Sequence, residues 1–234
     1  MRRVHRLALS GTVQSYLDRK QKSVSALNVE SVWKTARQTR TMENVVQTLK
    51  KMAGTRERCM YCMDSHGSDI EHFWPKKPYP DRTFLWPNML LCCTECGRFK
   101  GHQFPLSNGD QPLLVDPSAE EPWETLDFDP DTGNLTARYD TTSGRPSAKG
   151  EHTVHILQLD RRESMAEGYR RTYLRIVNRV QLALAEDVID WQQLQGDLQQ
   201  LDDHGLLGWC FGSIGRRLEP FDELFRRKPR SSIP

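Results

Sequence analysis

The sequence lacks any long hydrophobic run. Hydrophobic residues make up 37% of its 234 positions and charged residues 27%, and charges interrupt every window long enough to cross a bilayer. The first residues include several basic side chains but not the apolar centre of a secretory signal peptide. We therefore expect a cytoplasmic protein with no membrane partner.

The chain also lacks a large net charge, at +2. The near-neutral total hides an uneven distribution: residues 1–58 hold 13 Lys and Arg against 4 Asp and Glu, whereas residues 106–160 hold 3 against 11. A basic segment can neutralise phosphates and bind nucleic acid. Chance clustering on a solvated surface is the alternative interpretation.

Cysteine is scarce, yet four of the six cysteines fall into two Cys-x-x-Cys pairs, Cys59/Cys62 and Cys93/Cys96. In a reducing compartment such pairs are metal ligands more often than disulfides. Four thiolates at this spacing predict a closed tetrahedral zinc site with a structural role, because no ligand position is left for water. An iron–sulfur cluster uses the same ligands and is the alternative. The remaining two, expected as small buried side chains, are Cys92 and Cys210.

Helical patterns dominate both ends of the chain. The first part predicts helices over residues 10–22, starting at a Ser10 cap, and over residues 28–54. The last part predicts helices over residues 162–184, 187–201 and 214–225.

Strand patterns occur only in the middle of the sequence. Two short β-like runs, residues 69–73 and 88–93, predict a hairpin whose long proline-rich loop no helix would accept, with a short helix after Cys96. Farther on, residues 135–139 and 153–159 predict two more short strands in an irregular connector.

Candidate catalytic residues lie between the two cysteine pairs. Asp69 and Glu71 share one face of the first predicted strand, and His72 follows directly. Metal-assisted phosphodiester cleavage requires a carboxylate that holds a divalent cation and a neutral imidazole that takes a proton from water. A Glu-His dipeptide alone is a weak signal, but its position between two predicted zinc-binding turns strengthens it.

A known pattern joins these motifs. In order they are Cys59-x-x-Cys62, Glu71-His72-Phe73-x-Pro75-Lys76, Asn88-x-Leu90-Leu91, Cys93-x-x-Cys96 and Lys100-Gly101. This order resembles the HNH (ββα-metal) endonuclease family in its zinc-binding form. Within that family it is most similar to the HNH component of Septu-type and retron-associated anti-phage systems, over most of the chain to about residue 185.

The resemblance implies roles for individual residues. His72 would be the general base, Glu71 the ligand of a catalytic Mg²⁺ or Mn²⁺, and Asn88 the residue that fixes the loop and the histidine. The side chains that would lie near the DNA backbone are Lys76, Arg98 and Lys100.

One signature residue of the family is missing. The family has a His or Asn directly after the second Cys-x-x-Cys, where this chain has Gly97, and glycine offers no ligand. Asp69, His102 or water could complete the shell of the ion. Five residues along a helix turn about 500°, so His102 could do so only if the helix breaks near Gly101.

The expected fold class is α+β, with a zinc-clipped ββα-metal (HNH) core, a helical N-terminal arm and a helical C-terminal region. The expected segments are a basic arm (1–58), the nuclease core (59–105), an acidic connector (106–160) and the helical region (161–234). By resemblance, the protein would cut DNA in an anti-phage complex with an ABC/SMC-type ATPase. The alternative is a catalytically weakened, zinc-containing subunit that binds nucleic acid or assists assembly.

Overall fold

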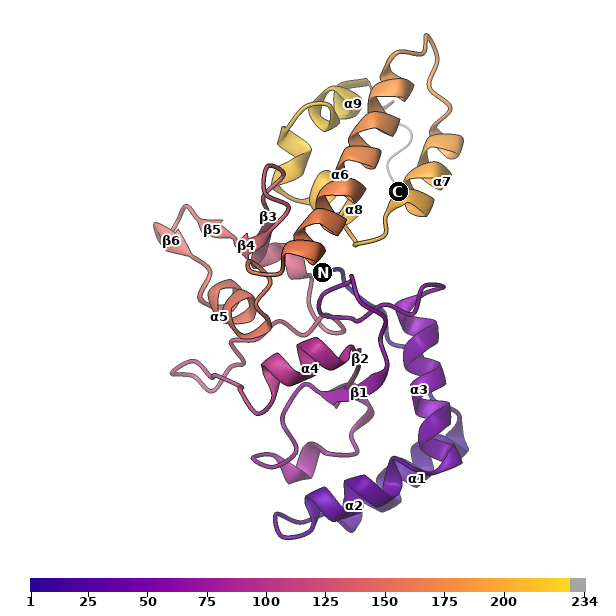
Figure 1. The fold of residues 1–234 in the computed structure, drawn as a ribbon, viewed down its shortest axis with the longest axis vertical. Helices are drawn as coiled ribbons and strands as arrows, with labels where there is room; N and C mark the ends of the chain where they lie inside the picture. The colour runs from indigo at the N-terminus through magenta and orange to yellow at the C-terminus, as the bar shows by residue number, and fades with distance from the viewer. Residues whose placement is uncertain (228–234) are drawn as a thin grey trace.

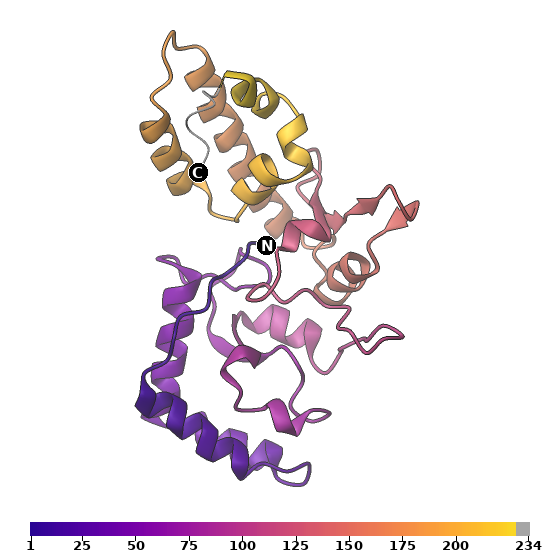
Figure 2. The same cartoon turned by 180° about the vertical axis from the view of Figure 1, so that it is seen from behind.

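The protein forms an elongated, mostly helical α+β molecule, here a computed structural model that describes residues 1–227 (Figure 1). The first three helices and a β-hairpin make one end, and the last helices make the other. The N-terminus lies between the two ends in both views (Figure 2). The strands of the described residues form three two-stranded sheets, so the predicted α+β class is confirmed.

The chain opens with three helices, α1 (Gly11–Lys22), α2 (Val29–Ala36) and α3 (Arg40–Ala53). The first starts at Ser10, as predicted. The single helix expected over residues 28–54 is wrong, because Thr39 interrupts it. The Thr39 hydroxyl donates to the carbonyl of Ala36 and accepts from the amide of Met42, which ends one helix and caps the next.

A hairpin and a short helix follow: β1 (Asp69–His72), β2 (Met89–Cys92) and α4 (Thr94–Lys100). The two strands pair antiparallel, with Glu71 opposite Leu90. The loop between them contains two single 3-10 turns, η1 (Pro80–Arg82) and η2 (Trp86–Asn88). The predicted hairpin and its long loop are present, and the short helix predicted after Cys96 begins earlier, at Thr94.

The connector contains a 3-10 turn, four short strands and one helix: η3 (Pro122–Glu124), β3 (Leu126–Phe128), β4 (Leu135–Ala137), β5 (Tyr139–Asp140), β6 (Arg145–Pro146) and α5 (Ala148–Leu157). The strand predicted over residues 153–159 is wrong, because α5 covers most of it. Ser147 caps this helix by accepting from the amide of Gly150. The buried residues of α5 include Gly150, Thr153, Val154 and Leu157, which recur at helical spacing, so packing of this face outweighs the β propensity of the segment.

The C-terminal region is helical, as predicted: α6 (Glu163–Leu184), α7 (Trp191–Leu201), α8 (Leu207–Gly212), the 3-10 turn η4 (Ile214–Arg217) and α9 (Phe221–Arg227). Helix α6 is central, and α7 and α9 pack against it. The helix expected over residues 214–225 is split into η4 and α9, and α8 lies outside every predicted helix.

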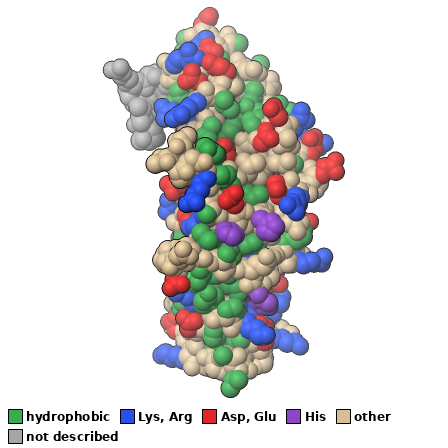
Figure 3. Space-filling view, turned by 90° about the vertical axis from the view of Figure 1, so that its left-hand side faces the viewer, with side chains coloured by type: hydrophobic (Ala, Val, Ile, Leu, Met, Phe, Trp, Pro, Cys, Tyr) green, Lys and Arg blue, Asp and Glu red, His purple; other side chains and the backbone are tan. Residues whose placement is uncertain are grey.

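No helix within residues 1–227 combines the length and hydropathy needed to cross a membrane. On the face shown in Figure 3, acidic and basic side chains are interspersed.

Candidate functional site

The four cysteines of the two Cys-x-x-Cys pairs come together in one buried cluster. All four Sγ atoms lie within 4.8 Å of one another. A tetrahedral zinc site with Zn–S distances of about 2.3 Å needs sulfur atoms about 3.8 Å apart. The Cys62 and Cys93 sulfurs are 3.9 Å apart, so the cluster is consistent with a structural zinc site.

Local backbone structure brings each pair to the cluster. The turn with Cys59 and Cys62 is tied to the hairpin by a hydrogen bond from the Met60 amide to the Leu91 carbonyl, 2.9 Å long. Cys93 is the N-cap of α4, and its sulfur accepts from the amide of Cys96 at 3.4 Å. The hairpin and the start of α4 therefore supply the frame that holds the four sulfurs.

A fifth cysteine lies beside the cluster. The Cys92 sulfur is 4.0 Å from that of Cys59, and its thiol donates to the carbonyl of Cys93 at 3.3 Å. Both Cys92 and Cys210 are buried, as predicted.

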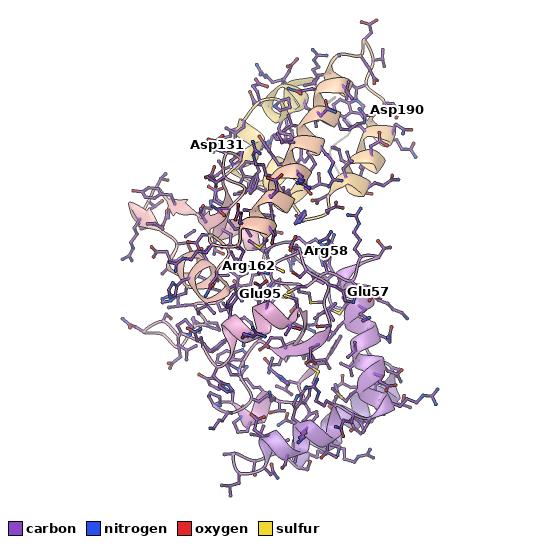
Figure 4. All side chains as sticks on the ribbon, in the orientation of Figure 1. Glu57, Arg58, Glu95, Asp131, Arg162 and Asp190 are labelled. Carbon is purple, nitrogen blue, oxygen red and sulfur yellow. The ribbon has the colours of Figure 1, made fainter. Side chains whose placement is uncertain are left out.

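The C-terminal region completes the surroundings of the cluster. Arg162, directly before α6, donates to the sulfur of Cys96 at 3.3 Å and pairs with Glu95 of α4. Figure 4 shows Arg162 and Glu95 facing each other where α6 meets α4. The Tyr169 hydroxyl donates to the Cys62 carbonyl at 3.0 Å. Such outer contacts orient metal ligands and partly neutralise their charge.

His72 ends β1 and is almost fully buried. Its Nε2 donates to the carbonyl of Thr83 at 2.9 Å, which leaves Nδ1 as the acceptor nitrogen. The Trp33 ring of α2 lies edge-on to the imidazole, with centroids 4.4 Å apart. Burial, followed by the charge of Lys76, lowers the His72 pKa to about 3. The imidazole is therefore neutral at physiological pH.

Asn88 closes the loop that leads back from His72. Its side-chain oxygen accepts from the Trp74 amide at 2.7 Å, and its amide donates to the carbonyls of Trp74 and Arg82. The Asn88 carbonyl also accepts from the Phe73 amide at 2.9 Å. This buried side chain thus ties together both ends of the β1–β2 loop.

Glu71 is paired with a lysine. The Lys100 ammonium donates to Glu71 Oε1 at 2.9 Å and to the His72 carbonyl at 2.7 Å, and the lysine side chain has no exposed surface. Gly97, one turn earlier in α4, leaves a gap: a Cβ there would lie 3.5 Å from Glu71 Oε2. The helix thus presents an ammonium and an empty position to the carboxylate.

This arrangement does not fit the divalent cation that the HNH resemblance implies. At an effective dielectric constant of about 20, a dication and an ammonium roughly 5 Å apart repel by about 7 kcal/mol. The whole binding free energy of an ion site with millimolar to micromolar affinity is about 4 to 8 kcal/mol. Lys100 in its present position would therefore cancel most of the affinity of Glu71 for such an ion.

The other predicted ion ligands lie elsewhere. Asp69 is exposed and pairs with Arg37 at 3.0 Å. Helix α4 ends before Gly101, which has φ +48°, and His102 follows in an exposed turn. Within residues 1–227, the four-cysteine cluster is the single group of three or more potential ligands close enough to share an ion.

The predicted DNA-contacting residues differ in exposure. Arg98 is exposed, and Lys76 is half-buried with its ammonium 5.7 Å from the centre of the Trp33 ring. Lys100 is buried, so it cannot reach a phosphate from its present position.

Sequence reasoning missed three side chains around the site: Trp33 over His72, Lys100 as the partner of Glu71, and Arg162 beside the cysteines. Each contact joins segments far apart in the chain, and no local motif marks it. A partial signal existed for Lys100, because residues 97 and 100 lie on one helix face.

Comparison with known proteins finds two similar sequences. One is a Septu protein PtuB from Bacillus mycoides (strain KBAB4), 32% identical over 53% of this chain and 50% of that protein. The other, a Septu protein PtuB from Bacillus thuringiensis, is 26% identical over 46% of this chain and 39% of that protein. The chain thus spans half or less of the length of these relatives. No family model matches the sequence, and no solved structure matches it.

Proposed function

We propose, from this similarity to Septu proteins, that the chain is the nuclease component of a Septu-type anti-phage system and hydrolyses phosphodiester bonds in DNA. The observation that supports hydrolysis best is the placement of His72 at the end of a β-strand, with Nε2 anchored on the Thr83 carbonyl so that Nδ1 keeps its lone pair. The HNH resemblance assigns the role of general base to this histidine.

The geometry around His72 suits proton abstraction from water. No hydrogen bond to Nδ1 occurs among the described residues. The Thr83 carbonyl fixes the tautomer, so the lone pair on Nδ1 is the one that would take a proton from water. Lys76 and Arg98 would bind phosphates beside this position, and Asn88 would keep the loop in place.

The resemblance assigns a Mg²⁺ or Mn²⁺ to Glu71. In this proposal such an ion binds only when Lys100 has moved away from the carboxylate. Asp69 and His102 are the remaining candidates for further ligands. Such an ion, when bound, supplies positive charge to a phosphate oxygen.

DNA and an ATPase are the proposed partners. The basic segment of residues 1–58 forms helices α1 to α3, which lie beside the hairpin (Figure 1), so its charge can attract a phosphate backbone to the His72 side. By the HNH and Septu resemblance, the ATPase would be of the ABC/SMC type and would control the nuclease.

The proposal is tested with plasmid DNA and either Mg²⁺ or Mn²⁺, using the protein alone and together with the product of the neighbouring gene, which the proposal expects to be the ATPase. We expect cleavage that His72→Ala abolishes. His155→Ala is the matched control, because His155 is an exposed residue of α5. Equal cleavage by the His72→Ala protein, or none by any preparation under any of these conditions, would rule out the proposed nuclease.

A second candidate function is favoured by Gly97 and by the pairing of Glu71 with Lys100. It is a zinc-containing subunit that binds nucleic acid or assists assembly without cutting. This candidate predicts salt-dependent DNA binding by the wild-type protein, unchanged in His72→Ala, with no cleavage in the presence of the ATPase.

A further inference from the structure

We propose that Lys100 is the resident cation of the Glu71 site and that its ammonium excludes divalent ions from this carboxylate in the free protein. The inference rests on the proposed function for the identity of the site. It differs from that function in one respect: no divalent ion binds Glu71 while Lys100 is in place. It concerns ion binding alone, and it is carried by the contacts between β1 and α4.

The ammonium takes the oxygens that an ion at this place would use. Lys100 Nζ donates to Glu71 Oε1 at 2.9 Å and to the His72 carbonyl at 2.7 Å. A hard cation such as Mg²⁺ or Mn²⁺ seeks the same types of oxygen, a carboxylate and a carbonyl. Lysine and ion therefore compete for one set of ligands.

Burial makes the ammonium difficult to displace. The Lys100 side chain has no exposed surface, and the exposed fraction of the Glu71 side chain is 18%. A buried ammonium that lost its carboxylate partner would be left uncompensated, which is strongly unfavourable. A solvated ion could bind the partly exposed Glu71 carboxylate only after the whole Lys100 side chain had moved away from it.

Gly97 leaves the space next to the Glu71 carboxylate without a ligand side chain, in addition to the Lys100 ammonium that repels an ion there. The second oxygen of Glu71, Oε2, faces the place where a side chain at residue 97 would begin, and only Cys92 Sγ, at 3.9 Å, is also near that place. A Cβ there would therefore be in ordinary van der Waals contact with both atoms. The absent ligand at residue 97 and the ammonium of Lys100 are two competing explanations for the exclusion of an ion, and variants at the two positions separate them.

The test measures Mn²⁺ binding by electron paramagnetic resonance, on zinc-loaded protein without DNA. We expect Lys100→Met to bind one Mn²⁺ per chain at Glu71 with a dissociation constant at least about tenfold lower than that of the wild type, whose Glu71 site should stay empty at the Mn²⁺ concentration that fills the variant. Lys100→Met/Glu71→Gln should lose this ion, and Lys100→Arg, which keeps the charge, should behave as the wild type. Wild-type binding of one Mn²⁺ that Glu71→Gln abolishes would overturn the inference, as would a folded Lys100→Met protein that gains no Mn²⁺.

Gly97→Asn keeps the test decisive if Lys100→Met does not fold. This variant supplies a ligand next to Oε2 and leaves Lys100 in place. We expect it to bind no Mn²⁺, whereas a gain of binding would show that a missing ligand, and not the lysine, excludes the ion. Because no DNA is present, failure of this inference and failure of the proposed cleavage are seen in different experiments.

Discussion

At the scale of the residue, the environment of His72 determines what this side chain can do. The imidazole is held by one backbone carbonyl and covered by one indole ring, and its pKa is lowered to about 3. General bases work best with a pKa near the working pH. Trp33 is one of the side chains that bury the imidazole, so we expect it to affect how strong a base His72 can be.

Replacing Trp33 with Ala should raise the pKa of His72 from about 3 toward the ordinary value of 6.5, because removal of the ring lets water reach the imidazole. The pH titration of the imidazole proton signals by NMR measures this shift. Trp33→Phe, which keeps an aromatic ring against His72, is the control and should change the pKa less. An unchanged His72 pKa in Trp33→Ala would show that the other contacts of the histidine keep it neutral.

The free energy of unfolding should decrease as the pH is lowered, because His72 is buried in its neutral form. The unfolded chain binds a proton here below pH 6.5, whereas the folded protein does so only near pH 3. The free energy of unfolding therefore decreases as pH falls through this window, by up to about 1.4 kcal/mol per pH unit. His204, whose pKa burial also lowers, contributes with the same sign.

Urea unfolding at pH 7 and at pH 5.5 tests whether protonation of His72 lowers the free energy of unfolding. These pH values are chosen because thiolates that bind zinc stay deprotonated between them. The wild type should lose about 1 kcal/mol more between the two pH values than His72→Gln, whose amide can still donate to Thr83. Parallel losses in the two proteins would contradict a folded pKa near 3 for His72.

At the scale of the element, the hairpin β1–β2 and helix α4 depend on the cysteine cluster. Cys93→Ser should remove the zinc, about one ion per chain in the wild type, and should destabilise the hairpin that carries His72. Metal analysis and thermal unfolding measure the two effects.

Cys92→Ser is the matched control for that change. Cys92 is the direct neighbour of Cys93 and equally buried, but it lies outside the group of four, and a serine hydroxyl can donate to the same carbonyl. It should keep the zinc. Loss of zinc in both variants would show that zinc binding requires Cys92 as well as Cys93.

The elements that the sequence predicts well are those with local signals. Ser10 caps α1 because its side chain needs only the first turn of the helix, and the cysteine spacing requires only two tight turns. The break at Thr39 and the helix at Ser147 also have side-chain caps, but they involve contacts with residues distant in the chain, Tyr16 at Thr39 and Thr125 at Gly150. Propensity alone could not decide those two places.

For the candidate site, the residue types were predictable and their partners were not. Glu71 and Lys100 both belong to the motif that carries the HNH resemblance, yet the sequence separates them by 29 residues. Their pairing follows from how α4 crosses the hairpin, which is a property of the tertiary structure. The roles proposed for Asp69, His102 and Arg98 stay predictions.

At the scale of the whole molecule, Arg162 joins the C-terminal region to the cysteine cluster. Arg162→Met should weaken zinc binding by about tenfold or more, because the guanidinium bonds to the Cys96 sulfur and pairs with Glu95. Competition with a chelator measures the affinity. Arg161→Met is the control, because Arg161 is exposed and pairs only with Asp160 within the described chain. Equal affinities in the two variants would show that Arg162 plays no part in metal retention.

The distance along the chain between the cysteines and Arg162 has a consequence for synthesis. All four sulfurs leave the ribosome once residue 96 has passed the exit, but Arg162 follows 66 residues after Cys96. At about 5 to 20 residues per second this interval lasts roughly 3 to 13 seconds. A newly made chain can thus acquire its metal early, and it holds the ion without the guanidinium until α6 has been translated.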